Sequence, residues 1–293
     1  MRRSMLFLPG NAPNMLINGP SLGADAVILD LEDAVAPSEK DAARILVRNT
    51  IRYTDFHGCE IIVRINSIDS PFWQRDLDEI LPQKPDLILL PKTSRAQDVL
   101  EADAYMAQVE ARLDFAPGTV RLMPLIETAL GVENAFSIAS ASGRVAAMLL
   151  GAEDLTADLR CKRTKEGREI EYARTRLVTA ARAAGVDVYD TPFTDVNDDE
   201  GIRVDAALAK ALGFTGKAAI SPRHVEVINQ VFSPTEREID YAYEVMDAIR
   251  RAKAQGKGAV ALYGKMIDAP IVARAEQTIA MAHALGLGRE EEA

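Results

Sequence analysis

Short apolar runs alternate with amphipathic stretches over the first three quarters of the chain. Eight runs have the character of β-strands, at residues 4–9, 26–31, 60–66, 86–92, 120–127, 145–151, 186–192 and 216–221. They are almost continuously apolar rather than alternating, which is typical of parallel strands buried on both faces. The stretches between them, such as 38–53 and 168–185, repeat apolar residues at helical spacing.

This order predicts an α/β fold in which residues 1–222 form a (β/α)8 TIM barrel rather than an open sheet. The glycine-rich turn of a dinucleotide-binding fold does not occur in the sequence. After residue 222 the pattern changes to a long helix at about 234–256, a glycine-rich link and a final helix at about 270–286. We expect residues 223–293 to be a C-terminal helical extension packed outside the barrel.

Composition narrows the function classes. The net charge is −10 and no block of Lys and Arg occurs, so we expect no nucleic-acid partner. No apolar run approaches the roughly 20 residues that span a membrane, and the N-terminal segment lacks a cleavage site, so we expect a cytoplasmic protein. The two cysteines and three histidines are scattered singly, which disfavours a zinc site.

Charged residues gather where the predicted strands end. They are Asp30, Glu32, Asp33, Arg64, Lys92, Glu127, Glu153, Asp154 and Asp190. In a TIM barrel the carboxyl ends of the strands surround the active-site mouth, so we expect these side chains to converge there. Carboxylates that lie so close together repel one another unless a cation lies among them. Carboxylate oxygens suit Mg²⁺, and the sequence therefore predicts a Mg²⁺ site in the mouth.

The pair Glu127 and Asp154 follows adjacent strands, so each could give one oxygen to Mg²⁺. The alternative is that Asp154 caps a helix beginning at Leu155. Arg64 could bind a substrate carboxylate, since its planar fork fits a carboxylate with two hydrogen bonds. A structural ion pair with Glu32 or Asp30 is the alternative for this arginine.

Backbone amides are the other predicted anion binders. Residues 151–154 open the loop after the sixth predicted strand. The N–H groups around Gly151, Ala152 and Glu153 could hold a substrate carboxylate there.

Nine short blocks make the chain resemble the β subunits of citrate lyase. The wider family is that of Mg²⁺-dependent acyl-thioester lyases, including malyl-CoA, citramalyl-CoA and citryl-CoA lyases and, more distantly, hydroxy-ketoacid aldolases. The blocks are RRSMLFLPGN, DAVILDLEDAV, EKDAAR, IVRIN, LPKT, PLIET, LLGAEDL, ISPRHVEVI and LYGKMIDAP. They occur in family order from residue 2 to about residue 270, which is nearly the whole chain.

The resemblance implies roles for residues in these blocks. Glu127 and Asp154 are the Mg²⁺ ligands, and Arg64 binds the keto-acid carboxylate. Asp268 is the acid/base group and reaches into the mouth of a neighbouring subunit. Two further sets are implied: Arg3, the Pro9-Gly10 turn and Lys40 at the thioester or phosphate end of CoA, and Glu32, Asp33 and Lys92 beside the metal. For Lys40, a solvated helix charge is the alternative.

One departure from the family falls at Tyr263, where citrate lyase subunits often have Asn. It affects the fit of the C-terminal segment and not the chemistry.

The reaction that the resemblance implies is retro-aldol cleavage of a citryl-thioester, carried on CoA or an acyl-carrier protein, to oxaloacetate and acetyl-thioester. A Schiff base on Lys92 would be the competing route, but the carboxylate cluster favours the metal. One alternative is a stand-alone malyl-CoA or citramalyl-CoA lyase or thioesterase. Another is a non-catalytic subunit that binds an acyl-carrier protein within a larger complex.

Partners also follow from the resemblance. It implies a homo-oligomer, trimer or hexamer, in which the extension covers a neighbouring subunit's site. Citrate lyase α and γ subunits are the other candidate partners.

Overall fold

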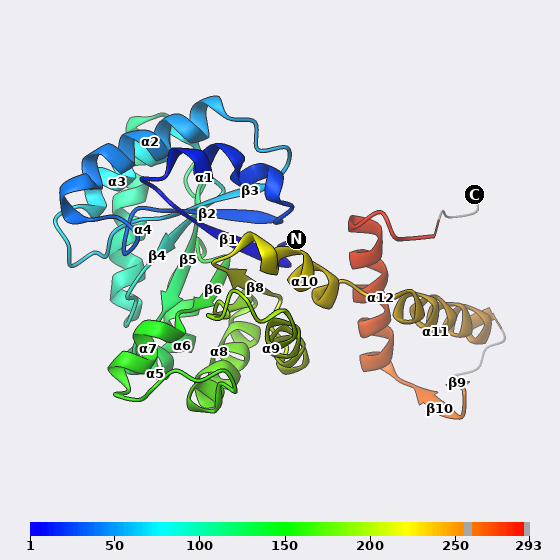
Figure 1. Cartoon of the computed structure of the whole chain (residues 1–293). Coiled ribbons are helices and arrows are strands. Elements are labelled where there is room, and N and C mark those ends of the chain that lie inside the picture. The colour runs from blue at the N-terminus through cyan, green and yellow to red at the C-terminus, as the bar shows by residue number, and fades with distance from the viewer. Residues whose placement is uncertain (255–259, 290–293) are drawn as a thin grey trace. The chain divides into compact units, whose positions relative to one another are not determined.

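Eight parallel strands close into a barrel in chain order, β1 to β8 (Figure 1). The computed structural model describes residues 1–254 and 260–289. The strands are β1 Ser4–Pro9, β2 Ala26–Asp30, β3 Glu60–Arg64, β4 Leu87–Leu90, β5 Arg121–Ile126, β6 Ala147–Leu150, β7 Asp187–Asp190 and β8 Gly216–Ala219. The predicted (β/α)8 barrel with a C-terminal helical extension is confirmed, and each predicted strand contains an observed one.

Helices cover the outside of the barrel. They are α1 Pro13–Asn18, α2 Lys40–Tyr53, α3 Trp73–Ile80, α4 Ala96–Arg112, α5 Ala129–Glu133, α6 Ala135–Ala139, α7 Ala152–Asp158, α8 Glu171–Ala184, α9 Asp199–Leu212 and α10 Pro222–Phe232. In α2 the apolar residues Ala43, Val47 and Ile51 recur every fourth position, so one face is buried against the barrel wall. Asp41 and Arg52 of the same helix are exposed, whereas its charged residues Lys40 and Arg44 are buried.

Alternation along each strand sorts side chains into two packed layers. Met5, Ile28, Ile62, Leu89, Leu125, Leu149, Tyr189 and Ala218 share the cluster that fills the barrel interior. Their neighbours, such as Leu29, Val63 and Val188, belong to the larger cluster between strands and helices. Both faces of every strand are therefore buried, which explains the continuously apolar runs.

The barrel closes where β1 pairs with β8, in the register Ser4–Lys217 to Leu6–Ala219. A Cβ at Gly216 would lie 2.1 Å from the carbonyl oxygen of Arg2, so only glycine allows this approach. At the same end, Arg2 pairs with Glu60, and Arg3 pairs with Asp25 at 2.7 Å. These ion pairs lie at the amino ends of the strands, opposite the expected mouth.

The chain divides into two compact units, Arg2–Phe232 and Ser233–Ala293. The expected boundary followed residue 222, whereas α10 clusters with the barrel. The second unit contains α11 Glu236–Ala254, α12 Ala269–Ala284 and a hairpin of β9 Val260–Leu262 and β10 Lys265–Ile267. The hairpin occupies part of the predicted glycine-rich link, of which residues 256–259 lie outside the described residues.

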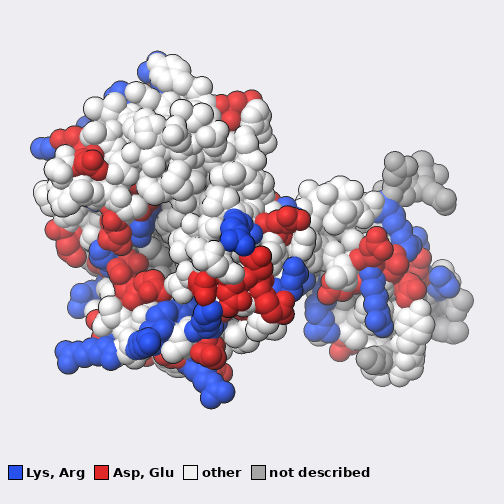
Figure 2. Space-filling view, viewed as in Figure 1, with Lys and Arg blue, Asp and Glu red and all other residues white. Residues whose placement is uncertain are grey.

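Surface charge is mixed rather than segregated. Acidic and basic side chains lie next to one another on the face of the barrel unit seen in Figure 2. Among the described residues, no helix is long and apolar enough to cross a membrane.

Candidate active site

A cavity of about 470 Å³ opens at the carboxyl ends of the strands. Predicted site residues that line it are Asp33, Arg64, Glu127, Gly151, Ala152, Glu153 and Asp154, together with Asp30. The lining also includes the apolar residues Phe7, Met15 and Ile220. The structure thus brings these predicted side chains together at the barrel end where active sites of this fold lie.

Glu127 directly follows β5 and is only 4% exposed. Its Oε1 accepts a hydrogen bond from the backbone N–H of Lys92 at 2.6 Å. Burial raises the pKa of Glu127 to about 8; the Lys92 N–H opposes this rise, and the charges of Glu32 and Asp154 add to it. A carboxylate in such surroundings is stabilised in its charged form by a cation.

Gly151 leaves room for this carboxylate. A Cβ at Gly151 would lie 2.7 Å from Glu127 Oε2 and 2.8 Å from Glu127 Cβ. Any side chain at position 151 would therefore displace Glu127, which explains the glycine at the end of β6.

Asp154 is half-buried and lies in the first turn of α7, on the same cavity. Because α7 begins at Ala152, the alternative in which Asp154 caps a helix starting at Leu155 is wrong. Among the described residues, no group of three or more His, Cys, Asp or Glu side chains could hold a metal ion. Two carboxylates still fit Mg²⁺, which is commonly bound by one or two carboxylates with substrate and water as the remaining ligands.

Arg64 is held by acids from the neighbouring strand end. Its Nε and Nη2 donate to the two oxygens of Asp30 at 2.7 and 2.6 Å, and Nη1 lies 3.0 Å from Glu32 Oε2. The structural ion pair left open by the sequence is therefore present. The guanidinium still borders the cavity, with its orientation set by Asp30.

Lys92 follows β4 and makes an ion pair with Glu32 at 2.6 Å and a longer one with Asp33 at 3.6 Å. Burial lowers the pKa of Lys92, but the hydrogen bond and charge of Glu32 outweigh it, so the pKa is raised. A Schiff-base lysine needs a lowered pKa, so the structure favours the metal route.

Two predicted amide donors already have partners. The N–H of Gly151 donates to Ile126 O at 2.9 Å, and that of Ala152 donates to Thr191 Oγ1 at 3.1 Å. Both residues line the cavity, but these N–H groups are not free to hold a ligand carboxylate. Sequence reasoning missed Thr191, which is buried directly after β7.

Three residues of the barrel unit that the sequence singled out, Arg3, Lys40 and Asp190, do not line the cavity. Arg3 pairs with Asp25 at the opposite end of the barrel. Lys40 is buried rather than solvated, and its Nζ donates to the carbonyl oxygens of Leu31 and Glu32 at 2.8 and 2.7 Å.

Asp190 contributes to the packing between strands and helices, and Asp268 belongs to the second unit. Asp190 is fully buried and hydrogen-bonded to Lys217 and Arg174 instead of facing the mouth. Asp268 is exposed and caps α12 within the second unit, where its Oδ1 accepts the N–H of Ile271 at 3.2 Å.

A closed barrel with acids and an arginine at its strand ends defines the class of protein. Residues 3–222 match the family described as HpcH/HpaI aldolase/citrate lyase, and the chain belongs to this family. The predicted carbon–carbon lyase is confirmed at this level.

Comparison with individual proteins shows which members of the family the chain is similar to. The chain is 42% identical over 284 residues to citrate lyase subunit beta from Leuconostoc mesenteroides subsp. cremoris, covering 97% of this chain and 94% of that protein. It is 35% identical to L-malyl-CoA/β-methylmalyl-CoA lyase from Cereibacter sphaeroides, covering 96% of this chain and 94% of the relative. The structure of CitE from Mycobacterium tuberculosis in complex with magnesium, acetoacetate and coenzyme A aligns with a TM-score of 0.78 at 31% identity, covering 96% and 98% of the two chains.

Proposed function

We propose that this chain is a Mg²⁺-dependent lyase that cleaves a citryl-thioester into oxaloacetate and an acetyl-thioester. The observation that carries the proposal is the placing of Glu127 and Asp154 on one cavity beside Arg64. The similarity to citrate lyase subunit beta over 97% of the chain supports the choice of substrate. The relative solved with magnesium and coenzyme A supports the metal and the thioester.

Each residue has a defined task in this proposal. Glu127 and Asp154 hold Mg²⁺, which when bound lowers the pKa of the substrate hydroxyl and stabilises the charge that develops on its oxygen. Arg64, oriented by Asp30, binds the carboxylate of the oxaloacetate half and keeps the breaking bond aligned. Asp268 delivers or removes the proton at the acetyl carbon, from its own chain or a neighbouring one.

Several finer predictions belong to the same proposal. Glu32, Asp33 and Lys92 form the charged surroundings of the metal, and Lys40 supports the loop after β2. The thioester carrier is CoA or an acyl-carrier protein, and the protein acts as a homo-oligomer in the cytoplasm, alone or with citrate lyase α and γ subunits. The 35% identity to a malyl-CoA lyase makes the shorter malyl or citramalyl thioesters the second candidate substrates.

The test is a comparison of thioesters. The protein is incubated with citryl-CoA, citramalyl-CoA or malyl-CoA, each with Mg²⁺ or EDTA, and the released keto acid is followed. We expect Mg²⁺-dependent oxaloacetate from citryl-CoA and none from the Asp154→Asn variant. Release of pyruvate or glyoxylate from the other thioesters would change the proposed substrate but support the same cleavage reaction.

Absence of any keto acid would contradict a stand-alone lyase and favour the alternative of a carrier-binding subunit. An acyl-carrier protein loaded with the citryl group is then added. Release of oxaloacetate would show that only the carrier was missing, and no release would show that the protein does not catalyse the cleavage. Equally weak Mg²⁺ binding by the wild type and Asp154→Asn would show that the proposed metal site is wrong.

A further inference from the structure

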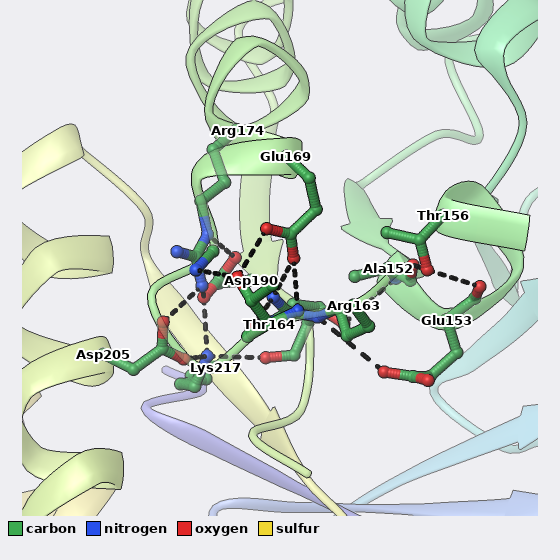
Figure 3. Close-up of polar contacts among 12 residues, drawn as sticks. Ala152, Glu153, Thr156, Arg163, Thr164, Glu169, Arg174, Asp190, Asp205 and Lys217 are labelled. Carbon is green, nitrogen blue, oxygen red and sulfur yellow. Dashed lines mark hydrogen bonds and ion pairs between the residues drawn. The ribbon is translucent and has the colours of Figure 1, made fainter. Parts of the chain in front are cut away.

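A buried cluster of charges lies beside the cavity and has no part in the chemistry proposed so far. It consists of Arg174 from α8, Asp190 from β7, Asp205 from α9 and Lys217 from β8, each 4% exposed or less (Figure 3). Two cations face two anions, so the cluster is electrically balanced. Arg174 donates to both oxygens of Asp190 at 2.9 and 2.8 Å, and to Asp205 at 2.6 Å.

Lys217 connects this cluster to the chain at the mouth. Its Nζ donates to Asp190 Oδ2 and to the carbonyl oxygen of Thr191, both at 2.6 Å. A fully buried ammonium with short hydrogen bonds holds its acceptors tightly, because water cannot replace an acceptor that is lost. The backbone at Thr191 is therefore fixed by the cluster.

Thr191 in turn holds the start of α7. Its Oγ1 accepts the N–H of Ala152 at 3.1 Å, and its side chain borders the cavity. The first N–H groups of a helix have no partner within it and are usually satisfied by the side chain of the preceding residue.

Position 151 cannot supply such a side chain. It must be glycine, because a Cβ would meet the carboxylate of Glu127 at 2.7 Å, and α7 has no side-chain cap from its own N-cap residue. Thr191, from the next strand end along the barrel, provides an acceptor for one of these first N–H groups, that of Ala152.

We propose that Thr191, held in place by Lys217, is a positioning residue that sets the first turn of α7 and so places Asp154 opposite Glu127. This inference rests on the proposed function, since it assigns Asp154 to the metal. Thr191 touches the reaction only through Ala152 and the helix that follows.

The test compares two substitutions of Thr191 in the full-length protein. Thr191→Val keeps the branched shape but removes the acceptor, whereas Thr191→Ser keeps the hydroxyl. We expect Thr191→Val to weaken Mg²⁺ binding, measured by calorimetry without substrate, by about tenfold and to lower kcat by about tenfold or more. Thr191→Ser should restore both to within about threefold of the wild type.

Two controls separate positioning from general loss of structure. Thr50→Val removes another buried threonine hydroxyl, on α2, which donates to Leu46 O, and should leave Mg²⁺ binding unchanged. Hydrogen exchange of the Ala152 amide should be faster in Thr191→Val than in Thr191→Ser.

Each outcome decides the inference. Wild-type Mg²⁺ affinity in Thr191→Val, or equal losses in both Thr191 variants, would overturn it while leaving the metal site intact. A wild type that binds no Mg²⁺ would overturn the proposed function, and the placement of Asp154 for the metal with it. Loss in Thr191→Val, rescue in Thr191→Ser and the faster Ala152 exchange together would establish it.

Discussion

At the scale of single residues, the buried carboxylate of Glu127 controls how metal binding depends on pH. Its pKa is raised to about 8, first by burial and further by neighbouring acids. Below that pH a proton occupies the carboxylate and competes with the metal. We therefore expect Mg²⁺ to bind more tightly as the pH rises from about 6 to about 9, with little further change above. Calorimetric titrations across this range provide the measurement.

Glu127→Gln is the control for this prediction. The glutamine cannot titrate, so binding should be weak and without the same pH dependence. Wild-type affinity that stays flat across the range would show that Glu127 is already ionised or does not ligate the metal.

Gly151 offers a second prediction at this scale. In Gly151→Ala the new methyl would lie 2.7 Å from Glu127 Oε2, so the carboxylate must move. Displacement of a reacting group by about 1 Å can cost about 100-fold in rate, and we expect a loss of that order in kcat/KM. Gly143→Ala is a matched control, because a Cβ there meets nothing within 4 Å. Equal turnover in the two variants would refute this view of Gly151.

Asp268 can be tested without disturbing the helix that it caps. Asn caps helices as well as Asp does, so Asp268→Asn should keep α12 but lose the acid/base group. We expect a large fall in kcat with an unchanged melting temperature. Asp268→Ala, which also removes the cap, should in addition cost about 1 kcal/mol in the free energy of unfolding. Full activity in Asp268→Asn would show that Asp268 acts only as a helix cap.

At the scale of elements, strand alternation explains which predicted acids reach the mouth. Ile28, Ile62 and Leu125 face the barrel interior, so Asp30, Arg64 and Glu127, each two residues later, continue in the same direction. The sequence could therefore predict these three from strand period and strand end.

The same rule shows why Asp190 was misplaced. Tyr189 faces the interior, so its neighbour Asp190 points to the helix layer, as does Lys217 next to the interior residue Ala218. The run at 216–221 contained the signal, since a lysine inside a buried strand requires an acidic partner. Its partner could not be named from sequence, because Asp190 and Asp205 come from different elements that only the fold brings together.

The hairpin of β9 and β10 escaped prediction because its turn lacks the usual residues. Tyr263 and Gly264 have φ values of +50° and +74°, and two such residues in succession normally call for Asn-Gly. We expect Tyr263→Asn to relieve the left-handed conformation and stabilise the C-terminal unit by about 1 kcal/mol, read from chemical denaturation. Tyr263→Phe, which loses only the hydrogen bond to Glu244, is the control. Destabilisation by Asn beyond that of Phe would contradict the strain argument.

At the scale of the whole molecule, the division into two compact units allows the contribution of each unit to activity to be tested separately. Removal of Ser233 onward leaves a barrel that contains its own core and the whole cavity lining. We expect this truncated protein to unfold cooperatively and bind Mg²⁺ like the full chain, but to lose lyase activity by about 100-fold or more because Asp268 is missing. Unchanged turnover would remove the C-terminal unit from the mechanism.

The pairing of β1 with β8 also determines when the protein can fold. The first strand leaves the ribosome long before its partner around Lys217 has been made, and contacts between such distant segments form slowly. Until then the edge of β1 offers unpaired backbone groups to other chains, which is a route to aggregation. The nascent N-terminal half therefore carries this exposed strand edge until the last strand has been synthesised.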